Sequence, residues 1–134
     1  MPRLSIWSIR ISLIYLVAGW SVGALLMLSR AWGFAPGLWG LLELHVALVL
    51  YGWFLQVVIG VAYWMLPTFG GRENRGRVGA AWTSVIAVNA GVAWVGLKAV
   101  APLSAPPVEV VCWLVAVVSF GWHAWPRIKK FGED

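Results

Sequence analysis

Residues Glu43–Pro67 read ELHVALVLYGWFLQVVIGVAYWMLP, a long apolar stretch that decides the predicted fold. At about 1.5 Å of rise per residue, a helix over this stretch is longer than the ~30 Å hydrocarbon core of a bilayer. The stretch is therefore predicted to be a membrane-spanning helix.

The polar positions of this stretch share one face of the helix. They are spaced at helical intervals: His45, Gly52, Gln56 and Tyr63. At about 100° per residue these positions lie within roughly 20° of one direction, and Glu43 points nearly the opposite way. A polar group left unpaired in lipid costs several kcal/mol. We therefore expect this face to contact protein or a ligand.

The composition of the whole chain agrees with a membrane protein. Of its 134 residues 61% are hydrophobic and only 11% are charged, more apolar side chain than a soluble domain of this length can bury. The basic residues stand at the ends of apolar runs rather than along one face, which indicates membrane topology and excludes a nucleic-acid partner. A single cysteine, Cys112, excludes a disulfide framework and a cysteine metal cluster within one chain.

Four apolar runs predict four helices in a single transmembrane domain over residues 1–134, at about 6–29, 39–66, 78–100 and 108–125. Glycine and proline residues separate the runs, so the predicted fold class is an all-α, up-down-up-down bundle. Eight of the ten Lys and Arg residues fall on one side, and only Arg30 and Lys98 on the other. Both termini are therefore expected in the cytoplasm, and the protein in a prokaryotic cytoplasmic membrane.

The two histidines are the candidate metal ligands. In the predicted bundle His45 lies near the outer face and His123 near the inner one, about 14 Å apart in depth, so one iron would not take both. His45 then needs a partner at its own depth. Met27 offers a thioether, an accepted axial heme ligand, although filling apolar space is the more frequent role of methionine. A second copy of His45 in a symmetric homo-oligomer is the alternative.

Other polar residues have a structural and a functional interpretation. His123 stands between Trp122 and Trp125, which favours an interfacial anchor and leaves it a weaker ligand candidate. Asn89, in the middle of its run, is expected to form a helix-to-helix hydrogen bond.

Two further pairs of residues fall in or beside the outer half of the predicted bundle. Gly19 and Gly23 have the G-x-x-x-G spacing of closely packed helices, either within the chain or between copies. Glu43 and Glu109 are expected near the outer face as solvated carboxylates, or alternatively as proton-entry or metal-binding groups.

The pattern from His45 to Pro67, H-x6-G-W-x6-G-x2-Y-x3-P, resembles the second helix of the catalytic subunit of heme-copper oxidases and nitric oxide reductases. In that family a histidine near the outer end of this helix binds a low-spin heme. The resemblance therefore implies that His45 binds heme b.

The rest of that family's pattern is missing. Its catalytic subunit has about twelve helices, and the second heme ligand and the histidines of the oxygen-reducing centre come from helices that this chain lacks. Whether the chain catalyses any reaction thus stays open. The family's subunit contains three similar four-helix units, so a homotrimer of this chain would resemble one such subunit; a dimer is also possible.

The leading hypothesis is a heme b protein acting in electron transfer, with a respiratory-chain partner, or in binding a diatomic gas. Gly52 would leave room for the macrocycle, and Gln56 and Tyr63 would continue the polar face inward. One alternative is an accessory subunit of a respiratory complex without a cofactor. Another is copper bound at the outer face by His45, Met27 and Glu43 or Glu109.

Overall fold

The computed structural model describes residues 1–69, 74–101 and 106–128. It contains four helical segments long and apolar enough to cross a membrane: Arg3–Trp32, Pro36–Met65, Val78–Val100 and Val108–Arg127. The prediction of an all-helical protein with four apolar spans is confirmed. Helix α1, Arg3–Trp32, runs three residues further at each end than the expected range 6–29.

The second segment combines three kinds of helix in four stretches. It begins with the 3₁₀ helix η1, Pro36–Leu41, and continues through α2, Leu42–Val46. A π-helix, η2, then covers Ala47–Leu55, and α3 completes the segment over Gln56–Met65. Wide π turns inside α-helices are frequent at functional sites. His45 lies two residues before this wide stretch.

The turn after α1 is built on a glycine. Gly33 adopts the left-handed conformation with φ of 66°, and its N–H donates to the carbonyl of Ser29 at 2.9 Å. Only glycine takes this conformation without steric cost, so the helix ends here. The Ser29 hydroxyl donates to Ala35 O at 2.7 Å and fixes the following bend.

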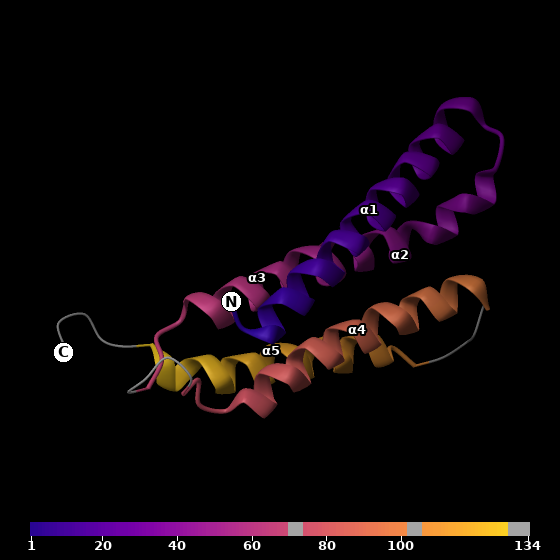
Figure 1. Cartoon of the computed structure of the whole chain (residues 1–134). Coiled ribbons are helices and arrows are strands. Elements are labelled where there is room, and N and C mark those ends of the chain that lie inside the picture. Colours follow the sequence, from indigo (N-terminus) through magenta and orange to yellow (C-terminus); the bar gives the residue numbers. More distant parts are fainter. Residues whose placement is uncertain (70–73, 102–105, 129–134) are drawn as a thin grey trace.

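Figure 1 shows the helices as two antiparallel hairpins. One consists of α1 and the second segment, and the other of α4, Val78–Val100, and α5, Val108–Ala124, which is followed by the 3₁₀ turn η3, Trp125–Arg127. The hairpins meet where α2, η2 and α3 contact α4. Towards the turn between α1 and η1 the first hairpin diverges from the second and extends past it (Figure 1).

Charged side chains mark the two ends of the molecule. At the end named here the Lys98 end, the Lys98 ammonium contacts Glu43 and Glu109. At the opposite end, named the Arg127 end, Arg127 contacts the last turn of α3. The apolar core lies between α1, α3, α4 and α5 and comprises Leu4, Ile59, Tyr63, Ala81, Val85, Val88 and Ala116.

The face of α1 that contacts the second segment carries small residues. Ser5, Ser8 and Ser12 are fully buried there. A Cβ atom placed on Gly60 would come within 2.9 Å of the Ser8 Cβ, and one on Gly19 within 2.7 Å of Val49. Small side chains let helix backbones approach closely in a membrane. The close packing predicted from the glycine pair is thus found within the chain.

A chain of side-chain hydrogen bonds joins three helices near their middle. The Tyr15 hydroxyl donates to Asn89 Oδ1 at 2.7 Å, and Asn89 Nδ2 donates to Gln56 Oε1 at 3.0 Å. Gln56 Nε2 reaches the Ser8 carbonyl at 3.4 Å. The predicted role of Asn89 as a helix-to-helix hydrogen bond is confirmed.

Replacing Asn89 by leucine is expected to destabilise the protein by about 1–2 kcal/mol, because Gln56 and Tyr15 lose their shared partner inside the bundle. Ala90→Leu is the matched control, since Ala90 is exposed on the same helix turn. Unfolding free energies measured in mixed micelles would compare the two variants. Equal stability of both would contradict a role for this network.

Candidate functional site in the His45 pocket

His45 is held in one orientation by the backbone of α1. Its Nδ1 lies 2.8 Å from the carbonyl oxygen of Gly19. A carbonyl oxygen only accepts, so in the neutral imidazole Nδ1 carries the proton and Nε2 keeps its lone pair. Within the described residues Nε2 has no hydrogen-bond partner. Histidines that bind metals have this arrangement, with the second ring N–H donated to a carbonyl or carboxylate.

Gly23 provides the space for the imidazole ring. A Cβ atom at this position would lie 2.7 Å from His45 Cε1 and 3.0 Å from His45 Nδ1. Every larger residue would therefore push the ring away from α1. The glycine pair thus has two functions: Gly19 supplies the carbonyl acceptor and Gly23 supplies the room.

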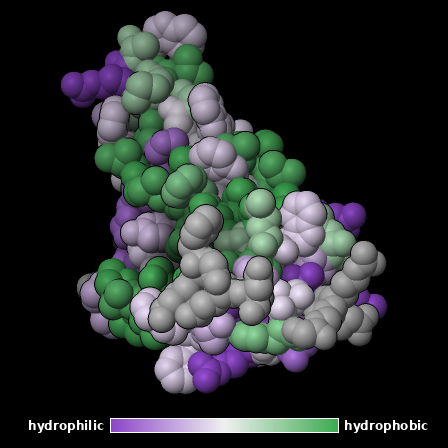
Figure 2. Space-filling model, turned by 90° about the vertical axis from the view of Figure 1, so that its left-hand side faces the viewer, coloured by the Kyte–Doolittle hydropathy of each residue, from purple (hydrophilic) through white to green (hydrophobic). Residues whose placement is uncertain are grey.

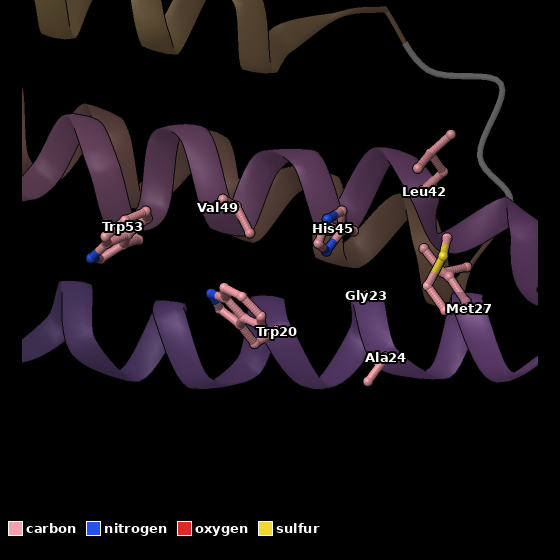
Figure 3. Close-up of a pocket in the computed structure, with 9 residues that line it drawn as sticks. Trp20, Gly23, Ala24, Met27, Leu42, His45, Val49 and Trp53 are labelled. Carbon is pink, nitrogen blue, oxygen red and sulfur yellow. The ribbon is translucent and has the colours of Figure 1, made fainter.

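A cavity of about 520 Å³ lies between α1 and the second segment, within the size range of small-molecule sites. Figure 3 shows side chains from both helices around it. The lining comprises Trp20, Gly23, Ala24, Leu26, Met27, Leu42, His45, Val49 and Trp53. The walls are almost wholly apolar, and His45 is the one residue of this lining with an imidazole. The cavity therefore suits an apolar molecule anchored at one polar point.

Met27 lines the same cavity as His45. A second axial ligand to the same iron would have to lie there. Met27 stands on α1 one turn beyond Gly23, and 61% of its surface is exposed (Figure 3). The structure therefore brings one imidazole and one thioether to the same space.

The other members of the predicted polar face lie outside the cavity. The space in front of Gly52 is filled by Tyr15, whose ring would be 2.8 Å from an added Cβ, so this glycine accommodates a side chain of the protein rather than a macrocycle. Gln56 belongs to the Asn89 network, and Tyr63 lies at the Arg127 end. Because Gly52, Gln56 and Tyr63 are all buried, the expectation that this face contacts protein is confirmed.

His123 is far from His45. Its ring stacks on Tyr63 at 5.1 Å between centroids, and Tyr63 follows His45 by eighteen residues, roughly 25 Å of helix. The separation exceeds the predicted 14 Å because the first hairpin extends beyond the second. The two histidines do not share one iron within a chain.

The expectation that His123 is an interfacial anchor is wrong. Its Nδ1 lies 3.0 Å from Arg77 O, and its Nε2 accepts from Arg127 Nη1 at 2.6 Å. The side chain is fully buried, whereas the neighbouring Trp122 and Trp125 are exposed. Both ring nitrogens are engaged by the protein, which removes His123 as a ligand in this arrangement.

The carboxylates at the Lys98 end are occupied by an ion pair. Lys98 Nζ lies 2.7 Å from Glu43 and 2.8 Å from Glu109, and Glu109 is only 5% exposed. The expectation of a solvated carboxylate is therefore wrong for Glu109. Both carboxylates therefore contact Lys98, and in the described part of the chain no three His, Cys, Asp or Glu side chains converge.

The two tryptophans of the cavity were not anticipated from the sequence. Trp20 and Trp53 lie on opposite walls, one on each helix (Figure 3). The sequence does carry a signal for the α1 side of the cavity. Gly19, Gly23 and Met27 recur every four residues and so share one face of α1.

A Gly23→Val substitution is expected to displace the His45 ring and to destabilise the protein by about 1–3 kcal/mol through overpacking. Gly79→Val is the control, because an added Cβ at Gly79 meets nothing within 4 Å. Thermal unfolding in detergent would measure both variants. A Gly23→Val protein as stable as the control would contradict the close fit of ring and glycine.

No protein-family model, curated protein or solved structure matches this chain. The likeness to the catalytic subunit of heme-copper oxidases therefore remains a resemblance over residues His45–Pro67. The functional proposal is therefore based on the geometry of the His45 pocket.

Proposed function

We propose that this membrane protein binds a b-type heme through His45 and serves in electron transfer or in the binding of a diatomic gas. The supporting observation is the bond from His45 Nδ1 to Gly19 O, which leaves the Nε2 lone pair beside an apolar cavity. Histidine nitrogen is a common axial ligand of heme iron. The protein would thus present the correct tautomer before the cofactor arrives.

The donor set and the walls of the cavity fit this cofactor. Trp20 and Trp53 offer flat apolar surface, and Leu26 and Val49 add to the apolar lining. When bound, heme would supply one-electron iron chemistry or an open coordination position for a gas. The residues of the chain would bind it, orient its ligand and keep the site dry.

Two sources of a second axial ligand are compatible with the proposal. Met27 lines the same cavity and would supply a thioether sulfur from the same chain. Alternatively, a copy of His45 would come from a neighbouring subunit, either in a dimer or in a trimer resembling the three four-helix units of the heme-copper oxidase catalytic subunit. A protein that uses neither would keep one position open for a gas.

We propose that both termini face the cytoplasm of a prokaryotic cell, with the His45 pocket towards the outer side of the membrane. The positive-inside rule supports this orientation. Arg75, Arg77 and Arg127 gather at the Arg127 end, whereas Lys98 at the other end is paired with two carboxylates. A respiratory-chain partner would then exchange electrons near the outer face.

The visible absorption spectrum of the detergent-purified protein, oxidised and reduced with dithionite, tests the proposal. We expect a Soret band, and sharp α and β bands after reduction if two protein ligands hold the iron. The oligomer mass of the same sample would show whether the second ligand comes from another copy. A colourless protein that takes up no added hemin would contradict the proposal and favour a cofactor-free accessory subunit.

A further inference from the structure

Three arginines gather around one aromatic pair at the Arg127 end. The guanidinium carbons of Arg75 and Arg127 lie 5.4 and 5.6 Å from the centroid of the Tyr63 ring, which stacks on His123. Arg75 Nη1 and Arg127 Nη2 both donate to the Tyr63 carbonyl, at 3.0 and 3.2 Å. Two cations therefore share a single neutral acceptor atom.

The turn before α4 places a third arginine, Arg77, beside the same aromatic pair. Gly76 has a φ of 69°, a conformation that glycine adopts readily, and it separates Arg75 from Arg77. Arg77 lies with its guanidinium 4.2 Å from the centroid of the Trp122 ring. Its carbonyl is bonded to His123, so both arginines border the same stacked pair.

The arginines differ in the donors that they leave available. All three guanidinium nitrogens of Arg127 are bonded to protein atoms, and the residue is 1% exposed. Arg75 uses Nη1 alone, and Arg77 uses Nη1 in a long 3.5 Å contact with Trp122 O. In residues 1–69, 74–101 and 106–128 the other nitrogens of Arg75 and Arg77 have no acceptor, and no carboxylate pairs with either side chain.

The depth of this cluster in the membrane indicates what would neutralise it. Trp122 and Trp125 are 61% and 80% exposed at the end of a spanning helix, the position of interfacial tryptophans. Figure 2 looks onto this end and shows hydrophilic side chains beside apolar flanks. Lipid phosphates lie at the same level, and basic pockets between membrane helices bind anionic headgroups.

We propose that Arg75 and Arg77 bind the headgroup phosphate of an anionic membrane lipid, with Arg127 adding positive charge behind them. The Trp122 ring, which lies against the Arg77 guanidinium, would hold it at headgroup level. The acyl chains would follow the apolar surface of α5. This site is separate from the His45 pocket and requires no heme.

Native mass spectrometry of the full chain tests the site, with dioleoylphosphatidylglycerol and dioleoylphosphatidylcholine added in equal amounts. We expect the wild type to retain the anionic lipid preferentially and Arg75→Gln/Arg77→Gln to lose about fivefold or more of that preference. Arg3→Gln/Arg10→Gln, which removes two exposed arginines of α1, should keep it. Equal retention of both lipids by the wild type, or an unchanged preference in the Arg75/Arg77 variant, would overturn the proposal.

Two further measurements cover misfolding and a different anion. Arg77→Gln alone removes a long hydrogen bond and the contact with the Trp122 ring, both made by an exposed side chain. It should still lower the occupancy of phosphatidylglycerol measurably, at unchanged circular dichroism. Millimolar inorganic phosphate should leave that occupancy unchanged in the wild type. An unaffected Arg77→Gln protein, or displacement of the lipid by phosphate, would overturn the assignment to a lipid headgroup.

Discussion

A His45→Ala variant is expected to lose heme while keeping its fold. The substitution removes the one imidazole of the cavity lining and, with it, the Nε2 lone pair proposed to bind iron. The loss of the hydrogen bond to Gly19 O costs about 1 kcal/mol, too little to unfold a spanning bundle. The ratio of heme to protein, measured from the Soret and ultraviolet bands, should fall by about tenfold or more.

His123→Gln is the control for this experiment. A glutamine amide can donate to Arg77 O and accept from Arg127, as the His123 ring does, so the Arg127 end should stay intact. The variant is expected to retain heme at the wild-type ratio. A His45→Ala protein with a full Soret band, or a folded His123→Gln protein without heme, would refute the assignment of His45 as the ligand.

The second large effect is expected at Arg127, where substitution by methionine should destabilise the protein by about 3 kcal/mol. The side chain is 1% exposed and donates to Leu66 O at 2.6 Å and to Pro67 O at 2.8 Å, carbonyls just past the end of α3. It also donates to His123 Nε2 at 2.6 Å. Charge-assisted hydrogen bonds contribute about 1.5–3 kcal/mol each, and the buried acceptors would be left without donors.

Arg10→Met is the matched control for the Arg127 variant. Arg10 lies on α1 and is exposed, so its replacement should change the unfolding free energy by less than about 0.5 kcal/mol. Unfolding followed by circular dichroism in mixed micelles would measure both. An Arg127→Met protein as stable as Arg10→Met would show that the cap on α3 contributes little.

The spans were predictable because a bilayer imposes length and apolarity on every helix that crosses it. The role of Asn89 was predictable for a similar reason, since a lone amide in that setting needs a partner on another helix. The position of His45 against protein followed from the cost of a lipid-facing imidazole. These features depend on the solvent rather than on particular neighbours.

Features that depend on particular neighbours were not predictable. The spacing of Gly52 showed that something approaches it closely, but the sequence does not reveal that the neighbour is Tyr15. The π-helix Ala47–Leu55, which packs against α1 and α4, departs from the uniform 100° turn on which the predicted polar face was based. Arg127 reads as a topology signal, yet its burial follows from the free carbonyls after α3.

Rescue of a His45→Gly variant by added imidazole tests ligation by His45 most directly. Removal of the ring leaves room beside Gly23 for a free imidazole to take its place. If His45 is the axial ligand, the variant should bind hemin poorly alone and regain the wild-type reduced spectrum as imidazole is titrated in. Wild-type heme binding without imidazole, or a folded variant that imidazole fails to restore, would contradict heme binding through His45.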